Sequence, residues 1–177
     1  VTAAISEAMA AGQTGYCPSE GTAEAVDAVT REAQRKGIHN PHHVYITTGA
    51  SEAIELALTA LLDPGDELLV PSPGYPLYTA LLSKLSATGV PYALDEANGW
   101  QPSVEDIEKL ITPRTKGISV INPNNPTGSI ADTKTLDGIV ELAKAHNLLL
   151  MSDEIYDKLT FDGQALTSLA SRAGDHP

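Results

Sequence analysis

The chain alternates short apolar or β-branched runs with longer segments whose apolar residues recur at helical spacing. Residues 22–36 carry apolar side chains three and four positions apart and lack proline and glycine, so they predict a helix. The same spacing predicts helices over 52–62 and 133–146, and a proline-rich loop precedes a further helix that ends near Ala87. Ser103 is expected to cap a short helix with acidic residues in its first turn.

Short runs between these helices have the composition of strands. The predicted strands cover residues 43–47, 67–70, 90–94, 117–121 and 148–152. Strands that alternate with helices, without a repeat or a linker, predict a single α/β unit over residues 1–177. Strands joined through crossover helices are normally parallel, so their carboxyl ends are expected to share one edge of the sheet.

Composition limits the partners of the chain. Its formal net charge is −12, and its eleven Lys and Arg residues are scattered, so no basic stripe exists for nucleic acid or an anionic membrane surface. No apolar run approaches the length of a membrane span, and the first eleven residues lack a signal-peptide pattern. We therefore expect neither nucleic acid nor a membrane as a partner.

The cysteine content and the ends of the sequence give two further expectations. Cys17 is the only cysteine, which excludes an internal disulfide and a cysteine-rich metal site and fits a reducing compartment. We predict no metal site and a cytoplasmic location. The sequence begins at Val1 without Met and ends at Pro177 without a closing helix, so we expect a piece of a longer chain.

Polar groups follow the predicted strands at the shared carboxyl edge, where open α/β sheets bind ligands. The segments concerned are 49–51, 72–75, 122–128 and 153–156. Together they offer a helix N-terminus for an anion, an aromatic ring, an amide, a carboxylate and a phenol. A ligand with complementary groups is therefore expected at this edge.

Each of these segments also has an ordinary structural interpretation. Ser51 suits a phosphate at a helix N-terminus, but a Ser at this place is usually only a cap. The segment is neither a GxGxxG fingerprint nor a GxxxxGK[ST] loop, so dinucleotides and nucleoside triphosphates are not expected. Asp153 ends an apolar strand, where its charge requires a partner such as a protonated ring nitrogen, or it caps the following turn.

The remaining candidates are equally open on the residues alone. Tyr156 lies three positions after Asp153 and either meets the same ligand or packs in the core. The loop 122–128 is either a turn or a rigid support for a buried amide, since its two prolines restrict it. Tyr75, flanked by Gly74 and a proline, is either a stacking platform or a packing residue.

The combination of two motifs resembles a known family. Asn-Pro-Asn-Asn-Pro-Thr-Gly at 122–128 is followed, 28 residues after Asn125, by Asp-Glu-Ile-Tyr at 153–156. This pairing resembles the class I/II aminotransferases of pyridoxal-phosphate (PLP) fold type I, and segments 47–53, 62–67 and 111–116 also match. The resemblance implies an incomplete three-layer α/β/α large domain with a mainly parallel sheet.

The resemblance also implies roles for individual residues. Asp153 would hold the protonated pyridine nitrogen of PLP, and Asn125 and Tyr156 would bond the ring hydroxyl. Tyr75 would stack on the ring. Asn125 would in addition touch the substrate carboxylate, the substrates being an amino acid and a 2-oxo acid.

For the cofactor phosphate, the resemblance implies Ala50 and Ser51 from the same chain. Tyr16 would reach the phosphate of the neighbouring subunit in a homodimer. The family's Schiff-base lysine lies in a Ser-Lys motif beyond the Asp-Glu-x-Tyr segment, and this sequence has no such motif there. Lys84, in a helix earlier in the chain, and Lys158, expected as an exposed helix residue, are not expected to replace it. This chain alone is therefore predicted to be catalytically inactive.

Three segments favour one branch of the family. Residues 15–17, 70–78 and 95–100 resemble the alanine (glutamate–pyruvate) aminotransferases most. Two alternatives stay open, namely a PLP-dependent β-lyase or cyclopropane-carboxylate synthase, and a catalytically empty module that binds a partner or dimerises. Exposed strand edges and an apolar face are expected to favour association.

Overall fold

A five-stranded sheet forms the centre of the protein in a computed structural model that describes residues 1–39 and 41–177. The strand order is β3-β2-β1-β4-β5, and all neighbours are parallel except β2 and β3. The strands are β1 (Glu67–Ser72), β2 (Thr88–Asp95), β3 (Gln101–Pro102), β4 (Thr115–Ile121) and β5 (Leu149–Asp153). The prediction of an α/β fold with a mainly parallel sheet is confirmed.

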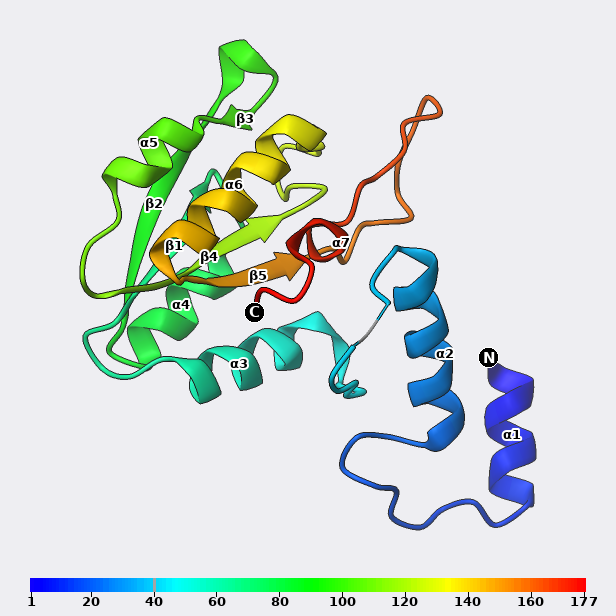
Figure 1. The fold of residues 1–177 in the computed structure, drawn as a ribbon. Helices are drawn as coiled ribbons and strands as arrows, with labels where there is room; N and C mark the ends of the chain where they lie inside the picture. The colour runs from blue at the N-terminus through cyan, green and yellow to red at the C-terminus, as the bar shows by residue number, and fades with distance from the viewer. Residues whose placement is uncertain (40) are drawn as a thin grey trace.

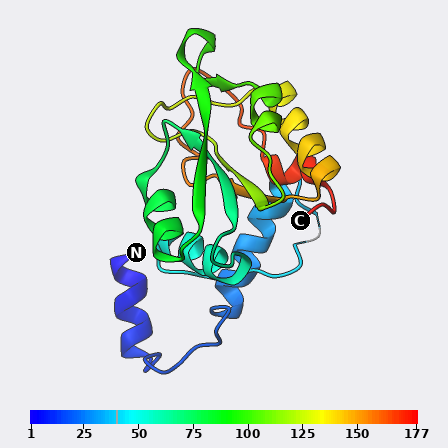
Figure 2. The ribbon, with the colours of Figure 1, turned by 90° about the vertical axis from the view of Figure 1, so that its left-hand side faces the viewer.

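Helices cover both faces of the sheet. One face carries α3 (Gly49–Leu61) and α4 (Pro76–Lys84), and the other carries α5 (Val104–Lys109), α6 (Thr133–His146) and α7 (Leu169–Ala173). Figure 1 shows the order of these elements, and Figure 2 shows α4 and α6 on opposite sides of the sheet. The short 3₁₀ helix η1 (Glu96–Asn98) joins β2 to β3.

Alternation along the strands produces two apolar cores. Leu68 and Val70 of β1 pack toward α3 and α4, whereas Leu69 packs toward α6. The first core also contains Ile54, Leu58, Tyr78, Leu82 and Ile121, and the second contains Tyr92, Ile107, Ile118, Leu136 and Ile139. Burial of this apolar surface on both faces stabilises the three layers.

The N-terminal region differs from the rest. Helices α1 (Thr2–Ala10) and α2 (Ala23–Arg35) lie away from the sheet (Figure 1), and none of the described residues before Gly49 is buried. Gly21, with φ +113°, lies against Ile46, where an added Cβ would come within 2.6 Å of a side-chain carbon. The Ile46 N–H donates to the Glu20 carbonyl at 2.8 Å, so the segments before and after α2 are joined.

Most predicted elements are confirmed with small shifts of their ends. The Ser103 hydroxyl accepts a hydrogen bond from the Asp106 N–H at 3.2 Å, as a helix cap should. The predicted helix ending near Ala87 stops at Lys84, because Ser86 adopts φ +59° before β2 begins.

One predicted strand is wrong. Residues 43–47 form a loop without strand pairing, in which Tyr45 is 58% exposed. A run of strand-forming residues becomes a strand only where a neighbour supplies hydrogen-bond partners, and the sheet ends at β3 and β5.

Two further expectations need correction. The short helix α7 was not predicted near the C-terminal end. Lys158, expected on a helix, is exposed but lies in a hydrogen-bonded turn. Within the part of the chain that the structure describes, no helix is both long and apolar enough to cross a bilayer.

Candidate cofactor site at the carboxyl edge of the sheet

A cavity of about 210 Å³ opens at the carboxyl edge of the sheet. Its walls come from the start of α3, the loops after β1 and β4, and the segment after β5. The lining residues are Ala50, Ser51, Ile54, Tyr75, Ile121, Asn125, Asp153, Ile155 and Tyr156. The structure thus brings together six of the seven residues that the sequence put forward for cofactor binding.

Asp153 is the last residue of β5 and is held from two sides. Its Oδ2 accepts a hydrogen bond from the buried Tyr78 hydroxyl at 3.2 Å, and its Oδ1 accepts one from the Ile155 N–H at 3.3 Å. The carboxylate therefore both caps the following turn, as the ordinary interpretation required, and lines the cavity.

Tyr78 is the site residue that the sequence did not reveal. Burial raises the pKa of its hydroxyl well above the ordinary value, and the Asp153 carboxylate raises it further. The phenol therefore stays protonated and donates to Asp153. The sequence offers one signal that Tyr78 belongs to the site. It lies three residues after Tyr75, at the start of α4, and residues three apart share a helix face.

The loop after β4 is fixed by its own amide side chains. The Asn124 Oδ1 accepts hydrogen bonds from the Thr127 N–H at 3.3 Å and the Thr127 hydroxyl at 2.9 Å. The buried Asn122 accepts from the Ala131 N–H at 3.0 Å. Both interpretations of the loop hold, since this turn presents Asn125 to the cavity, where its Nδ2 lies 3.5 Å from the Tyr156 hydroxyl.

The first turn of α3 forms another wall of the cavity. Thr48 is the N-cap residue, and its N–H donates to the Glu52 side chain. Ser51 lies inside the helix and is exposed, so it does not serve as the cap. The N–H groups of a first helical turn have no partner within the helix and carry the positive end of its dipole, which suits an anion.

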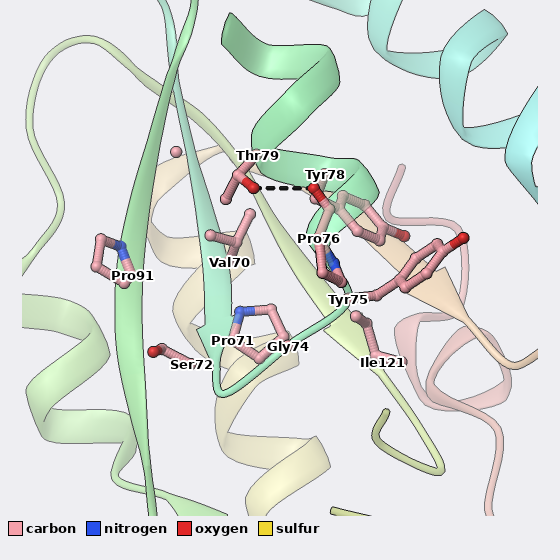
Figure 3. Close-up of a pocket in the computed structure, with 11 residues that line it drawn as sticks. Val70, Pro71, Ser72, Gly74, Tyr75, Pro76, Tyr78, Thr79, Pro91 and Ile121 are labelled. Atoms are coloured by element: carbon pink, nitrogen blue, oxygen red, sulfur yellow. Dashed lines mark hydrogen bonds between the residues drawn. The ribbon is translucent and has the colours of Figure 1, made fainter. Parts of the chain in front are cut away.

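Tyr75 lies at the N-cap of α4, directly before Pro76. It is shared between this cavity and a neighbouring cavity of about 300 Å³ between α4 and the sheet. Figure 3 shows the rings of Tyr75 and Tyr78 projecting to the same side, away from Pro91 and Ser72. Tyr75 therefore contributes an aromatic side chain to the cavity that Asp153 also lines.

Three other residues lie apart from the cavity. Tyr16 is fully exposed between α1 and α2, so a single chain does not bring it to the other six. Lys84 pairs with Glu55 at 2.6 Å, and Lys158 pairs with Glu32 at 2.8 Å. Among the described residues that line the cavity, none is a lysine.

Comparison with known proteins agrees with this geometry. The sequence matches the family described as Aminotransferase class I and II along residues 1–177. It is 46% identical over 163 residues to the glutamate-pyruvate aminotransferase AlaA of Escherichia coli (strain K12), covering 91% of this chain and 40% of that protein. It is 48% identical over 164 residues to the alanine aminotransferase of Mycobacterium tuberculosis (strain H37Rv), covering 91% and 38%.

Solved structures are similar in fold as well. A crystal structure of an aminotransferase from Escherichia coli matches with a TM-score of 0.88 and 46% identity, over 90% of this chain and 40% of that one. The aspartate aminotransferase from Thermus thermophilus with maleate matches with a TM-score of 0.91 and 32% identity, over 99% and 46%.

The chain spans about 40% of the length of the curated relatives that it matches. The family match nevertheless runs from its first residue to its last. The chain therefore belongs to the class I and II aminotransferases, a family of enzymes whose cofactor is pyridoxal phosphate.

Proposed function

We propose that residues 1–177 form a PLP-binding part of an aminotransferase large domain. The reaction would move an amino group between an amino acid and a 2-oxo acid, in an alanine or glutamate–pyruvate type of exchange. One observation carries the proposal, namely the single cavity where a carboxylate, an amide, a phenol, an aromatic ring and a helix N-terminus meet. The similarity to a glutamate-pyruvate aminotransferase and to an alanine aminotransferase supports the alanine type.

The donor set of the cavity fits PLP group by group. Asp153 would pair with the protonated ring nitrogen, and the adjacent Asn125 and Tyr156 would bond the ring hydroxyl. Tyr75 would stack on the ring, while Ala50 and Ser51 would meet the phosphate at the start of α3. When bound, PLP supplies an electron sink for the bonds at the amino acid's α-carbon. Asn125 would also orient the substrate carboxylate.

The chain on its own should bind PLP without a covalent bond. Transamination requires an amine that binds the cofactor and shuttles a proton, and no lysine lines the described cavity. We therefore propose that this polypeptide alone does not transfer amino groups between alanine and 2-oxoglutarate.

A PLP titration followed by absorbance and equilibrium dialysis tests this proposal. One equivalent should bind, and Asp153→Asn should weaken binding at least about tenfold, since it removes a hydrogen bond between charged groups. Asp137→Asn is the matched control, because Asp137 pairs with Arg172 and does not line the cavity. Borohydride treatment should leave no PLP adduct on a lysine. A stoichiometric adduct or measurable alanine turnover would contradict the inactivity.

A homodimer and the role of Tyr16 form part of the same proposal. Tyr16 is exposed on the connection between α1 and α2, where a second chain has access to it. Chains carrying Tyr16→Phe and chains carrying Asp153→Asn should each bind PLP weakly, and their mixture should regain tight binding at a fraction of the sites. No recovery in a mixture that sedimentation shows to be dimeric would exclude the role of Tyr16.

A cytoplasmic location, proposed because Cys17 fits a reducing compartment, is tested by cell fractionation.

A further inference from the structure

Glu154 is a nearly buried carboxylate directly after Asp153, and its side chain is 9% exposed. Burial of a carboxylate is costly unless donors compensate it, and here the donors are complete. Its Oε1 accepts from the Ser152 hydroxyl at 2.8 Å, the Ser168 hydroxyl at 2.8 Å and the Leu169 N–H at 3.0 Å. Its Oε2 accepts from the Lys36 ammonium at 3.3 Å.

These donors come from three different elements. Ser152 belongs to β5, Ser168 and Leu169 begin α7, and Lys36 ends α2. In Figure 1 the start of α7 and one end of α2 lie near the end of β5. Glu154 therefore connects the end of β5 with two elements that are distant from it along the chain.

The same residue opens the turn that carries Tyr156. The Asp157 N–H donates to the Glu154 carbonyl at 3.0 Å, and the Leu159 N–H donates to the Tyr156 carbonyl at 2.8 Å. Lys36 also pairs with Asp157 at 2.6 Å, so one ammonium bridges the two ends of the turn.

Apolar contacts do little to hold this turn. Ile155 is 57% exposed and Leu159 is 61% exposed, so neither side chain anchors the turn in a core. The hydrogen bonds of the Glu154 carboxylate hold the turn instead. Glu154 itself does not line the cavity that Tyr156 lines.

From this arrangement we infer that Glu154 is a positioning residue for the cofactor site. Its carboxylate fixes the turn 154–157 and so holds the Tyr156 hydroxyl beside Asn125, which sets the affinity of the cavity for PLP. The inference rests on the proposed PLP-binding function for its ligand, but the fixing of the turn is a property of the chain itself.

A double-mutant cycle on PLP affinity tests the coupling to Tyr156. Glu154→Gln keeps the shape and removes the charge, and should weaken PLP binding about tenfold in the native chain, as loss of a charged hydrogen-bond acceptor does. In the Tyr156→Phe background the same change should weaken it less than about twofold, because the hydroxyl that it positions is already absent. Equal factors in both backgrounds would mean a merely structural role and would overturn the inference.

Hydrogen exchange of the ligand-free chain tests the fixing of the turn. The amides of Asp157 and Leu159 should exchange at least about fivefold faster in Glu154→Gln than in the native chain, since local opening becomes easier. Glu141→Gln is the matched control, because Glu141 pairs with Lys144 within α6, away from the turn, and it should leave both rates unchanged. Unchanged rates in Glu154→Gln would also overturn the inference. If the native chain binds no PLP, the proposed function fails and these rates alone decide the role of Glu154.

Discussion

The N-terminal region (residues 1–48) and the sheet region (residues 49–177) are held together by different forces. The sheet region buries apolar side chains on both faces of a parallel sheet, with Leu58, Leu69 and Ile118 at 0% exposure. The described part of the N-terminal region buries none and meets the sheet region through the ion pairs of Lys36 and Glu32. Each buried aliphatic side chain contributes about 1.5–3 kcal/mol, whereas an exposed ion pair such as Glu32–Lys158 contributes about 0–1 kcal/mol.

This contrast shows which region fixes the positions of the site residues. All residues that line the cavity belong to the sheet region, whereas Tyr16 belongs to the N-terminal region. Most ligand groups within one chain are therefore placed by the packed sheet region, whereas Tyr156 is held through Glu154. The N-terminal region carries Tyr16, which would serve a second chain in the proposed dimer. The predictions below test this division, beginning with the largest effect.

Leu58→Ala should lower the free energy of unfolding by about 2–5 kcal/mol, because it leaves a cavity in the core against α3. Ile5→Ala in the N-terminal region should change it by less than about 0.5 kcal/mol, because Ile5 is 55% exposed. Urea unfolding of both variants measures the difference. Comparable losses at the two positions would show that the N-terminal region has a core of its own.

The second prediction concerns Glu67, a buried carboxylate at the start of β1. A hydrogen bond from the Thr112 hydroxyl holds its pKa below the ordinary 4.5, against the effect of burial, and the Arg114 guanidinium lowers the pKa further. A lowered pKa in the folded state gives stability that is present above pH 4.5 and lost as the pH falls through the folded value.

Thr112→Val should therefore cost about 1.5–3 kcal/mol at pH 7, and most of the cost should disappear below the folded pKa of Glu67. The part that stays reflects the Arg114 N–H, which donates to the same hydroxyl at 3.1 Å. Unfolding curves from pH 7 down to pH 3 measure it. Thr79→Val is the control, because the Thr79 hydroxyl donates to the Pro76 carbonyl, which does not titrate. A cost for Thr112→Val that stays constant with pH would refute the assignment to Glu67.

A third prediction separates stability from cofactor affinity inside the sheet region. Tyr78→Phe removes the donor to Asp153 and should weaken PLP binding about tenfold, the effect of about 1.4 kcal/mol. Tyr92→Phe removes an equally buried hydroxyl that donates to the Ser119 carbonyl, away from the cavity, and should lower stability without changing PLP affinity. If both variants bind PLP alike, the Tyr78–Asp153 contact has no role in the site.

The smallest effect concerns the attachment of the N-terminal region. Burial lowers the pKa of Lys36, but the Asp157 and Glu154 carboxylates outweigh it, so the net pKa lies above 10.5. The ion pairs of Lys36 therefore hold α2 fully below pH 10.5. They weaken as the pH rises through the pKa that Lys36 has in the folded chain.

Lys36→Met should lower stability by about 1 kcal/mol while freeing α2, since Glu154 keeps its three other donors. A dye on Cys17, the only cysteine, should show lower fluorescence anisotropy in this variant at pH 7, and in the native chain only above pH 10.5. Lys116→Met, which breaks a pair with Asp66 within the sheet region, should leave the anisotropy unchanged.

The sequence predicted the sheet region better than the N-terminal region, where the helix at 22–36 is confirmed as α2 but α1 was not predicted. Helices such as 133–146 carry a strong apolar period because they pack on a sheet, and three of the four segments at the carboxyl edge follow strands of the parallel sheet. Segment 49–51 reaches the cavity from the start of α3, although no strand precedes it. The strand predicted at 43–47 failed because pairing depends on a neighbour that the local pattern does not specify.

Contacts between distant side chains were also beyond the sequence pattern. Tyr78 and Asp153 are 75 positions apart, and Lys36 and Glu154 are 118 positions apart. Neither pair leaves a periodic signal, because one hydroxyl or ammonium finds its acceptor only after the layers have packed. The resemblance supplied the cavity residues, but the residues that support them came from the structure.

The pairing of Ile121 with Asp153 at the carboxyl ends of β4 and β5 has a consequence for folding. Side chains alternate along a strand, so a slip of β5 by one residue turns Asp153 away and puts Ser152 or Glu154 in its place. A chain caught in that pairing keeps its helices but lacks the Asp153 side chain at the cavity. A ligand that binds Asp153 stabilises only the native alignment, by RT ln(1 + [L]/Kd), and so selects the correctly assembled sheet.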